Sequence, residues 1–261
     1  ITDYTIPSNI TRIEKHAFRG CTELTKVTIP TGLKIIGEWA FSRCTSITHI
    51  NIPDNVSRIE KYAFDDCANL TKVTIQTGLK TIGEHAFSRC MSLTNVTIPN
   101  SVTSIGGCSF ADCSSLTRID IPNSVTMLGK YVFVGCSSLK SVTIPNSVTN
   151  MCSTFSNCNS LKTYYGSTDP DGDFSNYVIP NGVTDISSIF GSCSLLTMAP
   201  VIPDGVIDMS CTFYGCTTLT TAPVIPSSVI NTNNIVITST NMVTPLFLFI
   251  CLPPNYLYSI S

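Results

Sequence analysis

The chain has 261 residues, of which 43% are hydrophobic and 12% charged, against roughly 25% charged in an average soluble protein. Its polarity comes from Ser, Thr and Asn, which is unlike a disordered chain or a nucleic-acid-binding domain, and the net charge is -2. Residues 1–150 hold 14 of the 15 Lys and Arg residues and 11 of the 17 acids, a net +3, whereas residues 151–261 carry a net -5. We therefore expect any attraction for anionic ligands in the first half.

A 23-residue period dominates the chain. A proline, a phenylalanine and a cysteine recur in step with it, at Pro7, Pro30, Pro53, Pro99, Pro122 and Pro145, at Phe18, Phe41, Phe64, Phe87, Phe110 and Phe133, and at Cys21, Cys44, Cys67, Cys90, Cys113 and Cys136. Gln76 interrupts the proline series. A fixed period with apolar residues at fixed phases predicts a solenoid, in which each turn of chain buries its apolar face against the next.

The chain opens inside this pattern, because residues 1–7 match residues 24–30 phase for phase. A solenoid end needs a polar cap, which this opening strand lacks. We therefore expect a fragment of a longer protein.

One unit, residues 30–52, shows the expected elements in order. After Pro30, Thr31 and Gly32 form a turn, because such residues favour turn geometry. A short extended segment then points Leu33 and Ile36 inward. Ala40-Phe41 is predicted to form a tight helical or 3₁₀ turn, and residues 47–52 alternate apolar and polar as a strand with one buried face does.

The strand half reads Leu-x-x-Val-x-Ile, as in Leu70, Val73 and Ile75, which is the strand pattern of a leucine-rich repeat. With the preceding Ala-Phe-x-x-Cys-x-x-Leu and the following Ile-Pro-x-x-Val-Thr-x-Ile-Gly, it closely resembles the BspA-type leucine-rich repeats of bacterial and protist surface proteins. The resemblance covers about residues 1–230. It implies an α/β-type, mostly β, right-handed solenoid with a parallel sheet along one face and short helical or 3₁₀ turns. It also implies adhesion or partner binding, and it carries over no catalytic residues.

Past residue 150 the unit changes subtype. The spacing from proline to phenylalanine falls from eleven residues to ten, and Pro200 and Pro223 remove ladder donors, which weakens the sheet there. We expect a solenoid over residues 1–232, in two subtypes (1–144 and 145–232), with an inserted loop at about 164–177. Residues 233–261 form a C-terminal end segment, with a terminal strand as one reading, because its apolar run of residues 246–252 is too short to span a membrane.

Nine of the 13 cysteines share one repeat phase: the six above plus Cys158, Cys193 and Cys216. Side chains stacked in parallel at ~4.8 Å meet disulfide geometry poorly. We expect buried, free thiols that pack as small apolar groups. Cys108, Cys152, Cys211 and Cys251 are off-phase and are the better candidates for redox chemistry, with ordinary packing as the alternative.

Metal and catalytic signals are weak. The chain has no Cys-x-x-Cys pair, its three histidines do not cluster, and no cofactor or catalytic group is predicted. Asp169, Asp171 and Asp173 alternate as calcium loops begin, but Phe174 and Pro180 stand where an EF-hand has Gly and Glu. A plain acidic turn is the alternative.

The outward strand positions form two columns that we predict to bind a ligand. Their residues are Lys26, His49, Lys72, Asn95 and Arg118 in one column, and Thr28, Asn51, Thr74, Thr97 and Asp120 in the other. A third column precedes each core Phe on the opposite side, with His16, Trp39, Tyr62, His85, Cys108 and Tyr131. Its aromatics either anchor an interface or lie partly buried between turns.

These features predict a non-enzymatic adhesion or protein-binding module of a secreted or cell-surface protein. Its expected partner is a protein or glycan, including host or matrix molecules, and neither a nucleic acid nor a membrane-spanning segment is expected. Two alternatives stay open: an intracellular interaction scaffold of the same fold, and a repeat module appended to an enzyme.

Overall fold

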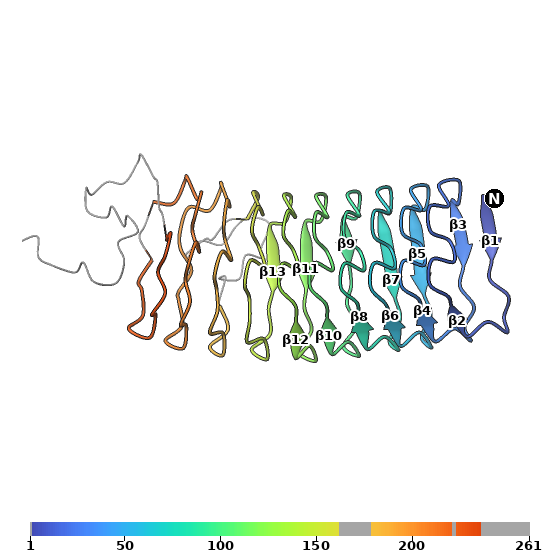
Figure 1. The fold of residues 1–261 in the computed structure, drawn as a ribbon, viewed down its shortest axis with the longest axis horizontal. Coiled ribbons are helices and arrows are strands. Elements are labelled where there is room, and N and C mark those ends of the chain that lie inside the picture. The colour runs from blue at the N-terminus through green and yellow to red at the C-terminus, as the bar shows by residue number, and fades with distance from the viewer. Residues whose placement is uncertain (1, 162–178, 221–222, 236–261) are drawn as a thin grey trace, which may run out of the picture.

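The computed structural model describes residues 2–161, 179–220 and 223–235, which form an elongated β-solenoid (Figure 1). Each 23-residue turn of chain, here called a rung, places one short strand on each of two faces. The odd-strand face holds β1 (Asp3–Thr5), β3 (Lys26–Thr28), β5 (His49–Ile52), β7 (Lys72–Ile75), β9 (Asn95–Val96), β11 (Arg118–Asp120) and β13 (Ser141–Thr143). The even-strand face holds β2 (Arg12–Ile13), β4 (Ile35–Ile36), β6 (Arg58–Ile59), β8 (Thr81–Ile82), β10 (Ser104–Ile105) and β12 (Met127–Leu128).

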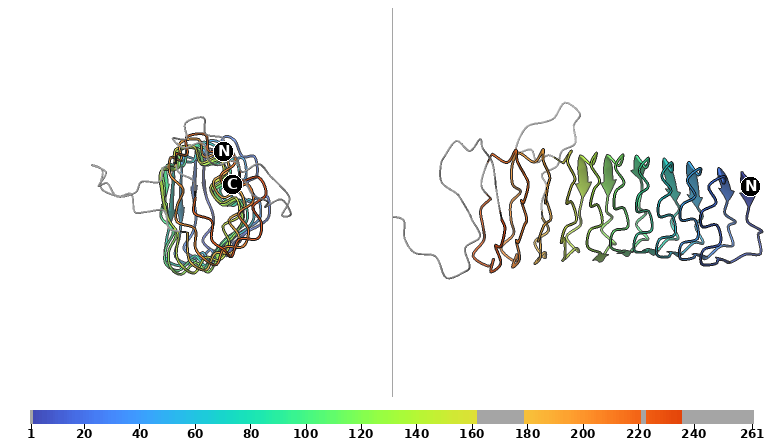
Figure 2. Two further views of the ribbon diagram at one scale, coloured as in Figure 1. Left: turned by 90° about the vertical axis from the view of Figure 1, so that its left-hand side faces the viewer. Right: turned by 45° about the horizontal axis from the view of Figure 1, so that its top comes forward.

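All strand pairs are parallel and join equivalent positions of successive rungs. The even strands form one six-stranded sheet in the order β12-β10-β8-β6-β4-β2. The odd strands form a two-stranded sheet, β1-β3, and a separate five-stranded sheet, β13-β11-β9-β7-β5. The predicted parallel solenoid is confirmed, and the view along its long axis shows the rungs superimposed (Figure 2).

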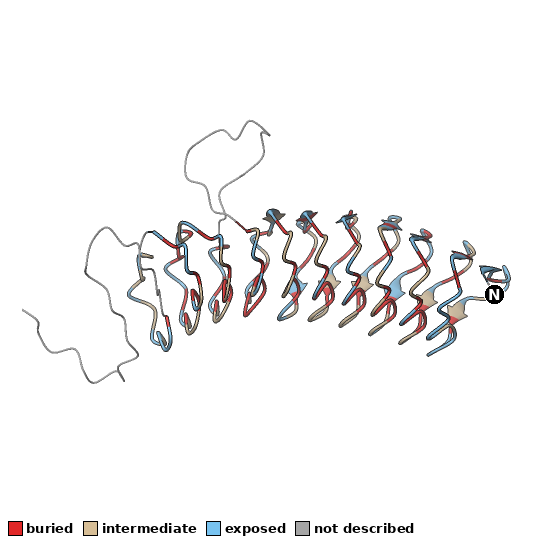
Figure 3. Cartoon of the chain, turned by 90° about the horizontal axis from the view of Figure 1, so that it is seen from above, coloured by how far each residue is buried: buried red, intermediate tan, exposed pale blue. Residues whose placement is uncertain are grey.

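A stack of phenylalanines fills the core along its length. Neighbouring rings from Phe18 to Phe213 lie 5.0–6.2 Å apart between centroids, with interplanar angles of 1–18°. This separation exceeds the ~3.5–4.0 Å of carbon atoms in direct contact, so the parallel rings are offset, an arrangement that aromatic quadrupoles favour. The predicted inward positions Leu33 and Ile36 are fully buried beside it. Buried and exposed residues alternate within each rung (Figure 3).

The segment around each Phe is a series of hydrogen-bonded turns; the described residues contain no helix. Bonds of the 3₁₀ type are present, such as Ala40 N to Gly37 O at 3.2 Å and Cys44 N to Phe41 O at 3.1 Å. They do not continue into a helix because Trp39 and Arg43 adopt left-handed φ angles of 58° and 60°. The helical or 3₁₀ turn expected at Ala40-Phe41 is therefore a short turn only.

These left-handed residues let a third backbone ladder form between rungs. The N–H groups of His85, Phe87 and Arg89 donate to carbonyls of the next rung at 2.9, 2.8 and 2.7 Å. The left-handed conformation costs roughly 1–2 kcal/mol for a non-glycine residue, so the extra inter-rung bonds offset local strain. Where both strands of a rung are paired, the rung is thus tied to its neighbours on three sides.

After β8 the chain approaches the preceding rung so closely that glycine is required there. At Gly83 an added Cβ would lie 2.6 Å from the carbonyl carbon of Glu60 in the preceding rung. No side chain larger than hydrogen fits there without moving the backbone.

The cysteine ladder occupies a specific place in the backbone. Each in-phase cysteine from Cys44 to Cys216 donates a hydrogen bond from its Sγ to the backbone carbonyl of the Phe in the preceding rung, at 3.0–3.3 Å. The predicted burial is confirmed for eight of the nine in-phase cysteines, whereas Cys21 in the first rung is exposed. Burial raises the pKa of each of these eight thiols, to about 12 at Cys44 and about 11 at Cys216.

The described residues of the second subtype form no regular strand, in agreement with the weaker sheet that Pro200 and Pro223 predict. Past Thr143, the described residues contain only isolated parallel bridges along the even-strand face, linking Asn150, Asp185, Asp208 and Asn231. The predicted loop at 164–177, the calcium candidates Asp169, Asp171 and Asp173, and most of the predicted end segment 233–261 lie outside the described residues.

We predict that Phe87→Ala costs more stability than Phe18→Ala. Phe87 is fully buried between two rings, so its loss should cost about 3–5 kcal/mol, whereas Phe18 is partly exposed and should cost less than about 3 kcal/mol. Urea titrations of both variants measure this difference. Equal losses would argue against nearest-neighbour stacking of rungs.

We further predict that the cysteine ladder makes stability fall at alkaline pH. Burial raises the pKa of the Cys90 thiol in the folded state, whereas the same thiol titrates near about pH 8.5 in the unfolded chain. The stability that the buried neutral thiol contributes is therefore fully present below about pH 8.5 and is lost as the pH rises above it. In reducing buffer, the free energy of unfolding of Cys90→Ala should therefore decline less steeply than that of the parent, by up to about 1.4 kcal/mol per pH unit between pH 9 and 10. Identical pH slopes for the two proteins would contradict this.

Candidate functional site

All ten predicted binding residues lie on the odd-strand face with exposed side chains: Lys26, Thr28, His49, Asn51, Lys72, Thr74, Asn95, Thr97, Arg118 and Asp120. Strand alternation accounts for this placement, since β3, β5, β7 and β11 each bury the residue between two exposed ones. We call the column that begins at Lys26 the cationic row and the column that begins at Thr28 the hydroxyl row.

Register pairing brings both rows into line across the strands. His49 pairs with Lys72 and Asn51 with Thr74 between β5 and β7. Lys72 then pairs with Asn95, and Asn95 with Arg118. The predicted columns therefore exist as geometric rows, although ligand binding by them stays a prediction.

The odd-strand face is interrupted between β3 and β5, which belong to separate sheets. A hollow of about 470 Å³ lies over this interruption. It is lined by residues 25–29, by residues 48–51, and by Lys72 and Thr74 of β7. The hollow thus contains the first three members of each row.

The charges around this hollow are unbalanced. Within the described residues, Lys26 and Lys72 form no ion pair, and no acidic residue lines the hollow. Asp3 pairs in register with Lys26, but its carboxylate accepts a hydrogen bond from Thr25 at 3.0 Å. Farther along the row, Arg118 is neutralised by Asp120, whose Oδ2 lies 3.2 Å from Nε. The available positive charge of the row therefore lies at Lys26 of β3 and Lys72 of β7.

The even-strand face has a hollow of about 590 Å³, and four of the five charged side chains that line it, all except Arg58, form ion pairs within the solenoid. Lys61 binds Glu84 at 2.9 Å, Arg12 binds Glu60 at 2.8 Å, and Lys15 binds Glu38 at 3.1 Å. Hydrogen bonds from Lys61 lower the pKa of the Glu84 carboxyl. A charged ligand there would have to compete with these internal partners.

The aromatic column is a stack between rungs. Trp39 lies 3.9 Å from Tyr62, and Tyr62 lies 4.6 Å from His85, with nearly parallel rings. The guanidinium of Arg19 lies 4.8 Å from the centre of the Trp39 ring. These ring faces are already in contact, and of the six predicted members only His16 and Tyr131 are classed as exposed. Partial burial between rungs, the second reading of the column, is confirmed.

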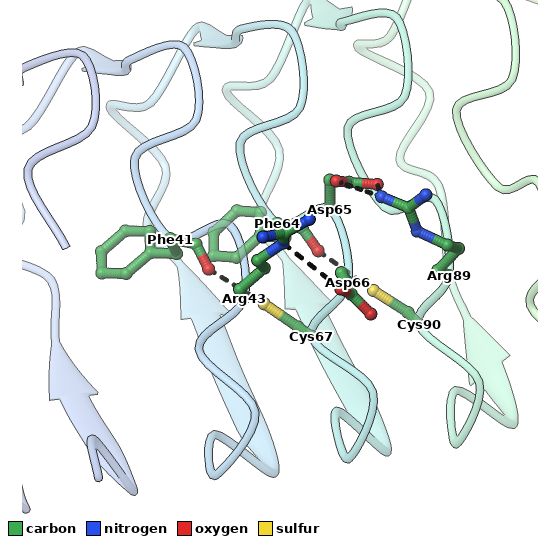
Figure 4. A network of polar contacts seen from close by, with 8 residues as sticks. All are labelled: Phe41, Arg43, Phe64, Asp65, Asp66, Cys67, Arg89 and Cys90. Carbon is green, nitrogen blue, oxygen red and sulfur yellow. Dashed lines mark hydrogen bonds and ion pairs between the residues drawn. The ribbon is translucent and has the colours of Figure 1, made fainter. Parts of the chain in front are cut away.

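A buried acid, Asp65, lies beside the Phe stack (Figure 4). Only 1% of it is exposed, and both carboxylate oxygens accept hydrogen bonds from Arg89, at 2.9 and 2.7 Å. Burial raises the pKa of Asp65, although the charge and hydrogen bonds of Arg89 act in the opposite direction. Next to this pair, Arg43 contacts Asp66 at 3.6 Å. The network ties three rungs together and leaves no open carboxylate for a ligand.

Other predicted sites gain no partners within the described residues. No three His, Cys, Asp or Glu side chains there are placed to share a metal ion. The off-phase Cys108 and Cys211 are partly exposed, Cys152 is buried against Ser187, and Cys251 lies outside the described residues. No helix in the described parts of the chain has the length and apolar character needed to cross a bilayer.

Sequence comparison agrees with this architecture. A family profile described as "BspA type Leucine rich repeat region" matches in six copies, over residues 1–93 and 59–168. The chain belongs to this family. The resemblance seen in the strand pattern is thus confirmed, and the chain is a leucine-rich-repeat solenoid, a class of repeat protein-interaction module. No curated protein matches the chain.

Several solved leucine-rich-repeat structures resemble this BspA-type solenoid. A protein from Bacteroides ovatus is 27% identical with a TM-score of 0.72, over 89% of this chain and 57% of that one, so the present chain spans little more than half of its length. A T. pallidum leucine-rich-repeat protein is 32% identical with a TM-score of 0.58, over 61% of this chain and 78% of that one. The pneumococcal vaccine antigen PcpA shares the fold at 20% identity, with a TM-score of 0.53, over 87% of this chain and 62% of that one.

Three features of the BspA-type solenoid were missed by sequence reasoning. The pairing of Arg118 with Asp120 had a signal, since residues two apart on a strand share a face. The burial of Asp65 also had one, because it shares its repeat phase with the buried Ser42 and Ser88. The interruption between β3 and β5 had no such signal, because both strands follow the repeat pattern.

We predict that Arg89→Met destabilises the solenoid only while Asp65 is present. The variant leaves the buried Asp65 carboxylate without its hydrogen-bond donors, which should lower the free energy of unfolding by about 1–3 kcal/mol. We expect the low end of this range, because 44% of the Arg89 side chain is exposed to solvent, which screens the charges. With Asp65→Ser, which copies the residue at this phase in the adjacent rungs, the same change should cost less than about 0.5 kcal/mol. A double-mutant cycle by urea denaturation tests this, and additive effects would contradict the pairing.

Proposed function

We propose that this BspA-type solenoid is a non-enzymatic binding and adhesion module of a secreted or cell-surface protein. Its partner, a protein or glycan of a host, matrix or neighbouring cell, binds the odd-strand face of the first half. The observation that carries the proposal is the exposed cationic row, which has unpaired lysines over a hollow that no acidic residue lines.

Rigidity supports binding on this face. The rows stand on strands whose backbones are fixed by pairing with neighbouring rungs, as in β5 with β7. Because the binding residues are ordered before the partner arrives, association loses less conformational entropy than it would on a flexible loop. A solenoid also repeats the arrangement at each rung, so a long partner has several equivalent contacts.

Charge distribution favours the odd-strand face over the other surfaces. Ion pairs occupy four of the five charged side chains that line the even-strand hollow, and ring contacts occupy the faces of the Trp39 column. Exposed charged groups without an internal ion pair are the ones free to exchange water for a ligand, so recognition is best supported at Lys26 and Lys72.

An intracellular scaffold of the same fold is the second candidate. The observation that favours it is the exposed thiol of Cys21, together with the partly exposed Cys108 and Cys211, because exposed free thiols suit a reducing compartment. Antibody labelling of intact cells that express the full-length protein separates the two candidates, since only a surface protein is stained without permeabilisation.

We predict that Lys26→Glu, Lys72→Glu and Arg118→Glu together reduce capture of matrix proteins or cells by at least about tenfold. Each exposed charge contact is worth about 0–1 kcal/mol, so three reversals are needed for a clear loss. The salt dependence of capture should fall with it, because exposed charges are screened over ~10 Å at 0.1 M salt.

The matched control reverses Lys34, Lys80 and Lys130, which are exposed and lie beside the even strands. It changes the net charge equally and should keep capture within about twofold of the parent. Equal loss in both triple variants would show a nonspecific charge effect. If capture is lost only when Trp39, Tyr62 and Tyr131 are replaced, the partner binds the other side of the solenoid and the proposal is wrong.

A further inference from the structure

The interruption between β3 and β5 leaves backbone hydrogen-bonding groups facing the hollow. On either side, the first residue of a strand bonds the preceding rung: Lys26 N of β3 donates to Thr2 O at 3.1 Å, and Lys72 N of β7 donates to Thr48 O at 3.3 Å. Among the described residues, no backbone bond joins β3 to β5. Polar backbone groups on these facing edges need partners from outside the sheet. The hollow is therefore a place where a polar ligand gains hydrogen bonds that the fold itself does not make.

The two rows give this hollow one charged side and one neutral side. Lys26, His49 and Lys72 line the first side. Thr28, Asn51 and Thr74 line the second, two residues farther along each strand, or about 6.6 Å away. A matching ligand carries an acidic group on one edge and hydroxyl groups on the other.

The spacing of the rows favours a polysaccharide over a peptide. Lys26 and Lys72 stand two rungs, or ~9.6 Å, apart, which is comparable to the advance over two sugars of an extended chain. An extended peptide places side chains of one face ~6.6–6.8 Å apart, so its acids fall out of step with the rungs, and it offers few hydroxyls to the second row. A single-stranded nucleic acid would need aromatic platforms for its bases, and no Phe, Tyr or Trp lines the hollow.

We propose that this hollow binds an acidic, carboxylate-bearing polysaccharide, with its carboxylates on the cationic row and its sugar hydroxyls on the hydroxyl row. The inference rests on the proposed function, because it names the chemical class of the partner on the same face. The chain of sugars runs across the strands, along the solenoid axis. Beyond β7 the site weakens, because Asn95 is neutral and Asp120 holds Arg118.

The experiment measures the affinity of the folded chain for oligomers of polygalacturonate by isothermal titration. Lys26→Gln with Lys72→Gln should weaken binding at least about tenfold, and Lys34→Gln with Lys80→Gln, which makes the same charge change near the even strands, should stay within about twofold. Thr28→Val with Thr74→Val should weaken binding several-fold, because only the hydroxyls are lost. The methyl-esterified oligomer, which keeps its hydroxyls but not its charge, should bind at least about tenfold more weakly than the acid.

Poly-L-glutamate separates an acidic peptide from an acidic sugar. The inference predicts that it binds more weakly than polygalacturonate and is insensitive to the Thr→Val changes. If polyglutamate binds as tightly, or if the Thr→Val pair leaves polygalacturonate binding unchanged, the polysaccharide assignment is wrong. If polygalacturonate does not bind but capture of matrix proteins still requires Lys26 and Lys72, this inference fails while the proposed function stands. If neither the oligomer nor the matrix proteins bind through this face, both fail.

Discussion

The fold depends on the requirement that every rung place the same side chain over the same side chain of its neighbour. Offset contacts of 5.0–6.2 Å between Phe rings satisfy this requirement in the core, and three backbone ladders satisfy it around the perimeter. Cysteine meets the same demand at its phase, because its thiol is small enough to stack and still donates to the Phe carbonyl of the rung before. A larger apolar residue would overpack this position, and Ala would leave that carbonyl without its thiol donor.

In-register stacking creates an electrostatic problem, since like charges on adjacent rungs repel. The turn columns avoid it by alternating sign, as in Lys15 with Glu38, Lys61 with Glu84, and Arg43 with Asp66. The cationic row avoids it differently, with His49 between Lys26 and Lys72, so its lysines stand two rungs, or about 9.6 Å, apart. That distance is close to the screening length in physiological salt, so repulsion is small. The fold thus tolerates these cations without needing them, which leaves recognition as their best-supported role.

Periodic residues were predictable and aperiodic ones were not. The inward position of Leu33 and Ile36, the Phe stack and the buried cysteines follow from phase alone, because every rung repeats one environment. Which surface charges remain free depends on single departures from the repeat, such as Asp120 two residues after Arg118. The hollow itself arises where strand pairing fails between β3 and β5, and residues that obey the repeat cannot indicate that failure. A tight turn at each Phe was predicted, but the left-handed φ angles at Trp39 and Arg43 were not, because neighbouring rungs rather than local sequence stabilise them.

The acids of the second half show why net charge alone misleads about binding surfaces. Asp185 accepts hydrogen bonds from the backbone and hydroxyl of Ser187, and Asp208 accepts the equivalent bonds from Ser210. Burial acts to raise the pKa of Asp208, but bonds from Ser210 and Asn231 outweigh it and hold that pKa below its usual value. These carboxylates close a corner of each rung where regular strands are absent, in place of a strand ladder. The carboxylates of Asp185 and Asp208 are therefore already hydrogen-bonded within the solenoid, whereas Lys26 and Lys72 form no ion pair with the described residues.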